Sequence, residues 1–593
     1  MLFNYTPRTT HEVRIGTTPL GGGHPLRLQS MTTCATTDTE GCVAQCIRII
    51  EAGADYVRLT TQGRREAENL RNIRDALRSR GYTTPLVADV HFNPNVADIA
   101  ATIVEKVRIN PGNYIDPART FRHLAYTPEE YAAELARLRD RFCRLLSICR
   151  EHGTALRIGV NHGSLSDRIM SHYGDTPEGI VESCMEFLRI CQSEHFPDVA
   201  VSIKASNTVV MVQSVRLLVE TMAREGMDYP LHLGVTEAGE GEDGRIKSAA
   251  GIGALLADGI GDTIRVSLSE APEAEVPVAY ALASYIARTR SGHDHIPAVA
   301  APEFVWTKPV RRPTCRVGRI GGGQVPVVVT PRKVVAAAET EQPRADYTLD
   351  AHPCLRPDQL MFAAEAEQRA KREGGGVVFL ALTYPLLTDE VRACLAQHPE
   401  IVVLAETLHS NPTGELRAIV HDLWRHRLTN PVVVHLHYGF ADKQDFAIAA
   451  AADASALFFD GLADGLMLTC GTPDADPEGV GERLSFAVLQ ATRQRQTKTE
   501  YISCPGCGRT LYDLRSTIAR IKAATQHLTG LKIGIMGCIV NGPGEMADAD
   551  YGYVGAGPSR VSLYRGKTCV EKNIPEADAV AHLLALIEAD QRP

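Results

Sequence analysis

The segment YVRLTTQ, residues 56–62, is a short apolar stretch that contains one arginine, Arg58, and ends in hydroxyl and amide side chains. It is one of eight short apolar segments in the first 270 residues, and stretches with helical character separate them. The eight segments are 26–33 (LRLQSMTT), 56–62, 86–92 (LVADVHF), 106–112 (KVRINPG), 155–161 (ALRIGVN), 200–206 (AVSIKAS), 231–237 (LHLGVTE) and 263–269 (TIRVSLS). Eight alternations of strand and helix predict an α/β fold with an N-terminal (β/α)8 TIM barrel.

Two of the intervening stretches show the start or the end of a helix. Residues 43–51 end before Gly53, and residues 179–192 follow Thr176 and Pro177, which suit a helix cap and a first-turn proline. An open doubly wound sheet is the alternative, but it normally carries a Gly-rich phosphate turn after its first strand. The nearest candidate, residues 251–253, lacks the third glycine and follows no convincing strand.

A change of composition marks a second α/β domain over residues 293–494. Prolines and three consecutive glycines punctuate its first part, and strands are predicted at 376–382, 401–405, 431–436 and 456–459, with a helix over 414–424. The sequence DGLAD at 460–464 echoes DGIGD at 258–262, which suggests a barrel-like, incomplete domain. We expect three domains: the barrel over 1–292, an inserted structural spacer over 293–494, and a small α+β domain over 495–593.

The composition argues against several classes of protein: general nucleic-acid binders, small secreted proteins and membrane proteins. The net charge of −9 makes general binding to nucleic acid unfavourable, so an anion site would have to be a local cluster of bases. The fifteen cysteines are an odd number and mostly lie singly, unlike the framework of a small secreted protein. The first residues, MLFNY, lack a signal-peptide pattern, and no apolar run is long enough to span a membrane. We therefore expect a reduced, cytoplasmic protein with neither nucleic acid nor membrane as a partner.

Basic residues interrupt five of the eight barrel strands, where an unpaired charge is expensive. They are Arg58, Arg108, Arg157, Lys204 and Arg265, called the clamp residues below. Because strand ends form the mouth of a barrel, five converging cations predict a polyanionic ligand such as a diphosphate. The alternative is that each base pairs with a buried carboxylate such as Asp89 or Glu105. Glu237 ends the seventh strand and is the best-placed carboxylate for acid–base chemistry, or else the ion-pair partner of an arginine.

Three cysteines in the last domain suggest a bound metal group. Cys504 and Cys507 form a C-x-x-C turn, and Cys538 follows in the segment GCIVNGPGE. Three cysteines suit an iron–sulfur cluster with one unusual ligand, while a zinc site or unligated thiols remain alternatives. The spacing leaves the fourth ligand open between Cys569 and Glu545.

Ten sequence blocks together resemble the 4-hydroxy-3-methylbut-2-enyl diphosphate synthase family of the methylerythritol phosphate route to isoprenoids. The blocks are QSMTT (29–33), VRLTTQ (57–62), ADVHFN (88–93), VRINPGN (107–113), LRIGVNHGSL (156–165), SIKASN (202–207), LGVTEAG (233–239), DTIRVSLS (262–269), ISCPGCGRT (502–510) and MGCIVNGPGE (536–545). They occur in the family's order and cover nearly all of residues 10–290 and 500–570. The middle region, about 295–490, resembles the insert of the long form of this family.

The resemblance implies an iron–sulfur oxidoreductase that uses a [4Fe–4S] cluster. Its substrate would be 2C-methyl-D-erythritol 2,4-cyclodiphosphate, which is opened and reduced by two electrons from reduced ferredoxin or flavodoxin. By motif match the cluster ligands would be Cys504, Cys507, Cys538 and Glu545 rather than Cys569, and Glu237 would lie near the reacting hydroxyls. The substrate-binding residues would be the five clamp residues with Ser267, Asn161 and Thr236. In short-form relatives, the barrel of one chain meets the cluster domain of its partner in a dimer. The resemblance leaves open whether this chain forms a homodimer.

Overall fold

The computed structural model describes the chain except for residues 1, 116–125, 291, 333–342, 373–375, 472–478, 511, 540–541, 547 and 592–593. The described residues form two compact units. The barrel unit consists of Arg8–Ser248, Gly261–Tyr280 and Lys498–Pro593. The half-barrel unit consists of Met1–Pro7, Ala249–Ile260 and Ala281–Thr497.

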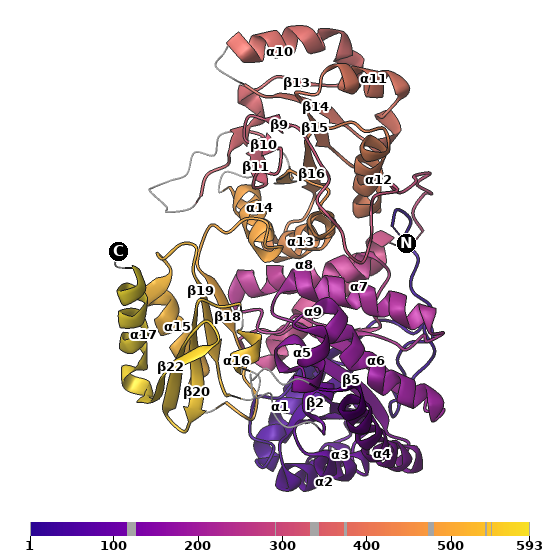
Figure 1. Cartoon of the computed structure of the whole chain (residues 1–593), viewed down its shortest axis with the longest axis vertical. Coiled ribbons are helices and arrows are strands. Elements are labelled where there is room, and N and C mark those ends of the chain that lie inside the picture. Colours follow the sequence, from indigo (N-terminus) through magenta and orange to yellow (C-terminus); the bar gives the residue numbers. More distant parts are fainter. Residues whose placement is uncertain are drawn as a thin grey trace. The chain divides into compact units, whose positions relative to one another are not determined.

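Eight parallel strands form a barrel in the order β6-β5-β4-β3-β2-β1-β8-β7. Figure 1 draws this part of the chain in indigo to magenta. The strands are β1 (Arg27–Met31), β2 (Tyr56–Thr61), β3 (Leu86–Val90), β4 (Lys106–Ile109), β5 (Ala155–Asn161), β6 (Val199–Lys204), β7 (His232–Leu233) and β8 (Thr263–Ile264). A parallel bridge between Val201 and Leu231 closes the ring, where the Val201 amide donates to the Pro230 carbonyl at 2.9 Å. All eight predicted strands, and the TIM barrel they imply, are confirmed.

Helices alternate with the barrel strands as the sequence predicts. They are α1 (Thr39–Glu51), α2 (Arg64–Ser79), α3 (Pro94–Ala101), α4 (Pro128–His152), α5 (Asp167–Tyr173), α6 (Pro177–Ser193), α7 (Thr208–Arg224), α8 (Gly241–Ala257) and α9 (Glu275–Arg290). At the start of α6, the Thr176 hydroxyl accepts from the Gly179 amide at 3.2 Å and Pro177 occupies the first turn. The predicted helix start is therefore confirmed.

An N-terminal hairpin seals the bottom of the barrel. Val13 and Leu20 pair in antiparallel fashion, with backbone hydrogen bonds of 2.7 and 3.0 Å. Their side chains pack in a buried cluster with Tyr56, Val87 and Ala155, which stand at or near the starts of their strands. This packing leaves the carboxyl ends of the strands as the open end, which is the end where barrels place their active sites.

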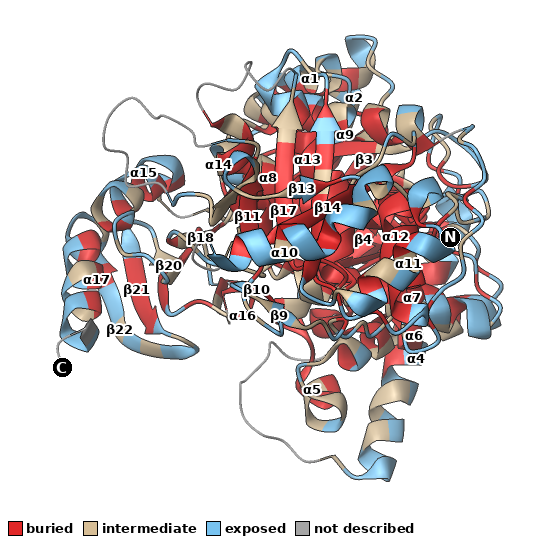
Figure 2. Ribbon diagram, turned by 90° about the horizontal axis from the view of Figure 1, so that it is seen from above, coloured by how far each residue is buried: buried red, intermediate tan, exposed pale blue. Residues whose placement is uncertain are grey.

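The half-barrel unit contains seven parallel strands in the order β12-β11-β17-β16-β15-β14-β13. They are β11 (Val327–Thr330), β12 (Tyr347–Thr348), β13 (Cys354–Leu355), β14 (Val378–Leu382), β15 (Ile401–Ala405), β16 (Val432–Tyr438) and β17 (Gly465–Cys470). Helices α10 (Ala363–Arg372), α11 (Asp389–Gln397), α12 (Pro412–Arg425), α13 (Lys443–Phe459) and α14 (Val480–Ala491) connect or follow them. Strand β11 and the first four residues of β17 are buried, and Figure 2 shows them in red. No bridge joins β12 to β13 in the described part of the chain, so this sheet is an open half-barrel.

One predicted strand, at residues 456–459, is wrong, because these residues form the last turn of helix α13. The helix is rich in alanine, begins at the cap Asp442 and is buried on all sides from Phe446 to Phe459. A helix buried on every side has no apolar periodicity, so its last turn resembles a buried strand in sequence. The strand that follows is β17.

The echo between residues 258–262 and 460–464 corresponds to a repeated structural turn. In each copy a helix ends at a glycine in the left-handed region, Gly259 with φ of 78° and Gly461 with φ of 69°. The aspartate three residues later then accepts a backbone hydrogen bond from a neighbouring segment: Asp262 from the Leu231 amide at 2.7 Å, and Asp464 from the Val432 amide at 3.0 Å. The middle region is barrel-like, as the echo suggested.

The C-terminal domain is a five-stranded mixed sheet with helices, in agreement with the predicted α+β class. Its strands are β18 (Glu500–Ser503), β19 (Lys532–Met536), β20 (Tyr551–Gly557), β21 (Arg560–Arg565) and β22 (Thr568–Pro575). The first three are parallel, and the last two add in antiparallel fashion. Helices α15 (Leu514–Thr525) and α17 (Glu576–Gln591) share an apolar core with this sheet, while α16 (Gly542–Glu545) is a single turn. Among the described residues, no helix is both long and apolar enough to cross a membrane.

Candidate functional site

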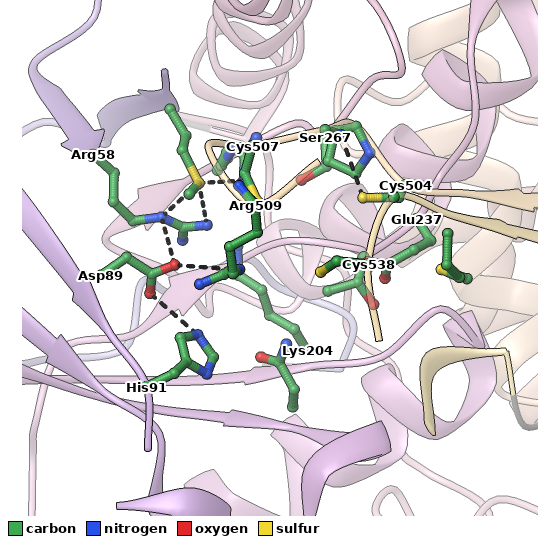
Figure 3. Close-up of a pocket in the computed structure, with 18 of the residues that line it drawn as sticks. Arg58, Asp89, His91, Lys204, Glu237, Ser267, Cys504, Cys507, Arg509 and Cys538 are labelled. Carbon is green, nitrogen blue, oxygen red and sulfur yellow. Dashed lines mark hydrogen bonds and ion pairs between the residues drawn. The ribbon is translucent and has the colours of Figure 1, made fainter. Parts of the chain in front are cut away.

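The open end of the barrel and the C-terminal domain of the same chain enclose one cavity (Figure 3). The space between its walls that protein atoms do not occupy is about 740 Å³, and this includes solvent at the open side. Its walls include the five clamp residues and Asn161, Thr236, Glu237, Ser267, Cys504, Cys507 and Cys538. The structure therefore brings together the clamp residues, the other residues that the resemblance assigns to the substrate and the three cysteines, while Glu545 is hydrogen-bonded to Thr236 of the wall.

Hydrogen bonds from barrel loops hold the C-terminal loops in place. The Ser269 hydroxyl donates to the Cys504 carbonyl at 3.0 Å, and the Ser206 hydroxyl donates to the Glu545 carbonyl at 2.8 Å. Gly163 and Gly544 approach so closely that a Cβ on Gly544 would overlap the Gly163 carbonyl, so glycine is required there. The loops that carry the cysteines and Glu545 are thus fixed over the barrel of their own chain.

The strands direct the clamp residues into the cavity. Arg58, Arg108 and Arg157 are each the third residue of their strands, β2, β4 and β5, and Arg108 and Arg157 are neighbours in register. Lys204 ends β6, and Arg265 directly follows β8. All five are less than one-tenth exposed.

Two clamp residues have the carboxylate partners that the ion-pair alternative requires. The Arg108 guanidinium donates to the Asp89 carboxylate at 2.8 Å and to the side-chain oxygen Oδ1 of Asn161 at 3.0 Å. Arg265 donates to both oxygens of Glu275, at 3.0 and 3.1 Å. Glu105, the other expected partner, instead pairs with Arg78 at 2.8 Å. For Arg108 and Arg265, a carboxylate of the protein therefore offsets the free-energy cost of burying the charge.

Arg58 has a carboxylate nearby but no close hydrogen bond to it. Its guanidinium donates to the Met31 sulfur at 2.7 Å, and its nearest carboxylate oxygen, on Asp89, is 3.9 Å away. Burial, opposed by Asp89 and reinforced by neighbouring guanidinium groups, lowers the pKa of Arg58 to about 9.

Arg157 and Lys204 have no carboxylate partner. Neither makes a hydrogen bond or ion pair with any residue that the structure describes, and the Arg157 Nε and Nη1 atoms are buried without partners. Burial first, and then the neighbouring cations, hold the pKa of each well below its usual range. Two buried, uncompensated cations side by side are unfavourable in the free protein and would be stabilised by a bound anion.

Two carboxyl groups meet on the other side of the cavity. The Thr236 hydroxyl donates to Glu545 Oε2 at 2.8 Å, while Glu545 Oε1 and Glu237 Oε2 are buried without partners. Burial raises the pKa of Glu237, and burial together with the nearby Glu237 carboxyl raises that of Glu545. Glu237 has a φ of 48°, an uncommon conformation for a residue with a side chain and one often found at functional sites.

The cysteines stand at the carboxyl ends of two parallel strands. Cys504 directly follows β18, and Cys538 lies two residues after β19. The Gly506 amide donates to Cys504 Sγ at 3.3 Å, and the Arg509 amide donates to Cys507 Sγ at 3.4 Å. Across the described residues, no three His, Cys, Asp or Glu side chains converge as ligands of a single ion. The three sulfurs are instead distributed over the cavity wall.

Sequence reasoning missed Arg509, which follows the C-x-x-C turn and points into the same cavity (Figure 3). Its Nη2 lies 3.7 Å from Asp89 Oδ2, and its Nε and Nη1 are buried without partners. Burial disfavours the charged guanidinium of Arg509. The nearby Cys507 and Asp89 side chains favour it more strongly, and the net effect raises the pKa of Arg509. A base next to a thiol pair was the signal that could have identified it.

His91 and Asp89 were not assigned to the site from the sequence, although both lie in the block ADVHFN. His91 Nε2 is 2.6 Å from the Arg108 guanidinium, and burial with Arg108 lowers the pKa of His91 to about 3. The neutral imidazole therefore accepts a hydrogen bond from Arg108. Cys569 is absent from the cavity wall; its sulfur donates to the Glu571 carbonyl at 3.6 Å on β22.

Known protein families and relatives match both parts of the chain that form the site, the barrel and the C-terminal domain. Residues 10–280 match the GcpE TIM-barrel domain, and residues 500–589 match the GcpE protein C-terminal domain. A relative from Bacteroides thetaiotaomicron, named 4-hydroxy-3-methylbut-2-en-1-yl diphosphate synthase (flavodoxin), is 58% identical and aligns with 100% of this chain and 99% of its own. One from Phocaeicola vulgatus with the same name is 59% identical, covering 99% of both chains. A rice relative named 4-hydroxy-3-methylbut-2-en-1-yl diphosphate synthase (ferredoxin), chloroplastic, is 41% identical over 98% of this chain and 87% of its own.

The difference between paired and unpaired clamp residues predicts opposite effects on stability. Arg265→Met leaves the Glu275 carboxylate buried without its partner, so we expect it to lower the free energy of unfolding by about 3–5 kcal/mol. Arg157→Met removes an uncompensated cation, so we expect a change of less than about 1 kcal/mol or a gain. Chemical denaturation of the ligand-free variants measures both. Equal destabilisation by the two substitutions would contradict the assignment of Arg157 as unpaired.

Proposed function

This chain belongs to the GcpE family, and on that premise we propose that it converts 2C-methyl-D-erythritol 2,4-cyclodiphosphate to 4-hydroxy-3-methylbut-2-enyl diphosphate with two electrons. The enzyme is an oxidoreductase of isoprenoid biosynthesis. The observation that carries the proposal is the single cavity, which has unpaired cations on the barrel side and three cysteines with a buried carboxyl on the other. Reduced flavodoxin or ferredoxin, named for the relatives, would supply the electrons.

The clamp residues would bind the cyclic diphosphate. Arg157 and Lys204 contribute charges that no described carboxylate neutralises, and Arg58 shares its carboxylate neighbour, Asp89, with Arg108. Hydroxyl and amide groups of Ser267, Thr236 and Asn161 on the same wall can add hydrogen bonds to the ligand. These cations also stabilise the charge that a phosphate oxygen gains when its bond to carbon breaks.

The donor set fits a four-iron cluster. Cys504, Cys507 and Cys538 line the cavity, and Glu545 Oε1, buried and without a partner, supplies an oxygen atom as a fourth ligand. Arg509, buried beside the thiols, would offset part of the negative charge of four anionic ligands. When bound, a [4Fe–4S] cluster provides one-electron transfer and a Lewis-acidic iron next to the substrate.

Glu237 and Glu545 are the groups suited to handle protons. In acid form, the cyclic diphosphate with two electrons and two protons gives the linear diphosphate and one water. Burial raises the pKa of Glu237, which favours the protonated form of a carboxyl that can donate a proton to a departing hydroxyl. We assign this donation to Glu237, because it lines the cavity and its Oε2 has no other partner among the described residues.

The assignment of the cluster ligands predicts that substitutions of Cys504 and Cys569 have different effects on iron content and activity. Cys504→Ser should lose most of its iron, whereas Cys569→Ser should retain iron, colour and activity, because Cys569 lies outside the cavity wall. Glu545→Gln should lower turnover. Iron and sulfide analysis of anaerobically purified protein, with its visible spectrum, measures this; we expect about four irons per chain. Iron loss from Cys569→Ser but not from Cys504→Ser would overturn the assignment.

A zinc-stabilised phosphate-binding protein without redox chemistry is the alternative from another class. It accounts for the clamp residues and the C-x-x-C turn, but not for the orphaned Glu545 carboxyl. Stoichiometric zinc in colourless protein would favour it, and the metal analysis therefore separates the two functions directly.

We also propose that the inserted region, residues 293–494, is a structural spacer. Where its strands end, polar side chains bind one another: His435 lies 3.1 Å from Glu406 Oε1 and 2.9 Å from Thr469 Oγ1. The double variant His435→Ala/His437→Ala should therefore keep the turnover rate and KM of the enzyme. Deletion of residues 295–490 should lower activity, and full activity after a clean deletion would refute an essential spacer role.

A further inference from the structure

Two cysteines that the proposed function does not use lie in contact at the carboxyl end of the first barrel strand. Cys34 belongs to the loop that joins β1 to α1, and Cys42 lies in the first turn of α1. Their Sγ atoms are 3.2 Å apart, and both thiols are free. A disulfide bond is about 2.05 Å long, so a movement of about 1 Å would bring the two sulfurs to bonding distance.

The side chain of Gln45 fixes the loop that carries Cys34. Gln45 Oε1 accepts from the backbone amides of Thr33 and Cys34, at 2.7 and 3.3 Å, and also lies 3.3 Å from Cys34 Sγ. Gln45 Nε2 in turn donates to the Thr33 hydroxyl at 2.9 Å. Because Gln45 and Cys42 are both on α1, these hydrogen bonds hold Cys34 next to Cys42 without a covalent link.

The two thiols differ in exposure and in acidity. Cys34 is half-buried, whereas Cys42 is fully buried. The hydrogen bond between the two thiols lowers the pKa of Cys34, and the same bond together with burial raises the pKa of Cys42. The thiolate is the form that attacks a disulfide, so Cys34 is suited to react first with a reagent from solvent and Cys42 to react second.

The surroundings of Cys34 are open to solvent. Its neighbours in sequence, Thr33 and Ala35, line a surface groove together with Gln45. None of these three residues belongs to the wall of the inner cavity. A small reagent can therefore reach Cys34 from outside without entering the proposed substrate site.

We propose that Cys34 and Cys42 form a reversible modification site, at which a low-molecular-weight disulfide oxidises the two thiols to a disulfide within the chain. This inference goes beyond the proposed function and does not depend on it. The Cys34 carbonyl packs against Gly508, where an added Cβ would lie only 2.8 Å away. The new bond would therefore tie α1 to the loop that contacts the segment after the C-x-x-C turn.

The chemistry proceeds in two exchange steps. The Cys34 thiolate attacks the reagent, breaks its S–S bond and releases one thiol, which leaves a mixed disulfide on Cys34. The Cys42 thiol then displaces the second reagent thiol and forms the bond to Cys34. Two protein thiols are thus oxidised, one reagent disulfide is reduced, and the two thiol protons end on the released reagent thiols. An excess of reagent thiol reverses both steps.

Peptide mapping of the full-length, anaerobically purified protein tests the proposal. The protein is incubated with glutathione disulfide, its remaining thiols are alkylated, and it is digested under non-reducing conditions with trypsin and an enzyme that cleaves before aspartate. Cleavage before Asp38 separates residues 28–37, which contain Cys34, from residues 38–48, which contain Cys42 and Cys46. We expect mass spectrometry to find these two fragments joined, and dithiothreitol to separate them.

Substitutions identify the partner of Cys34. Cys34→Ala and Cys42→Ala should abolish the link, whereas Cys46→Ala, which removes a second buried thiol one turn further along α1, should retain it. Fragments that stay separate in the wild-type protein, or that join only in denaturant, would overturn the proposal. A link that persists in Cys42→Ala or disappears in Cys46→Ala would equally overturn it. Synthase activity plays no part in this readout, so failure of the proposed function is a separate result.

Discussion

The site depends on two buried basic residues, Arg157 and Lys204, whose side chains have no partner within the part of the chain that the structure describes. Their strands are fixed by the closed barrel, so neither side chain can be released to solvent without disrupting the sheet. The protein surrounds them with further bases and compensates only some of these, as with Arg265 and Glu275. The surplus positive charge supports the proposed binding of a multiply charged anion, although the whole chain has a net charge of −9.

The second requirement is that the C-terminal domain covers the barrel mouth of its own chain. Short hydrogen bonds from barrel loops, and the contact between Gly163 and Gly544, bring the cysteines and Glu545 over the clamp residues. Covering the mouth buries the clamp residues, and a low-dielectric environment strengthens the electrostatic interactions within the site.

The barrel was predictable because its eight strands alternate with helices that carry ordinary caps and stops. The clamp was predictable because a base within an apolar strand is conspicuous. Which bases are paired was not predictable from the sequence. Arg108 pairs with Asp89 on the neighbouring strand β3, and Arg265 pairs with Glu275 at the start of α9, whereas Arg157 has no partner among the described residues. The turn at 456–459 was assigned to a strand because a helix buried on all sides has no periodicity. Arg509 was missed because its role depends on a fold that places it between the thiols and Asp89.

The central claim is that Arg157 and Lys204 lie in the cavity without a carboxylate partner among the described residues and are the groups with which a bound anion pairs. Calorimetric titration of the wild-type protein and of the variants Arg157→Met and Lys204→Met with the cyclic diphosphate tests it most directly. The account predicts that each substitution raises the dissociation constant by about tenfold or more, because a hydrogen bond to a charged group contributes about 1.5–3 kcal/mol. Unchanged dissociation constants for both variants would contradict it.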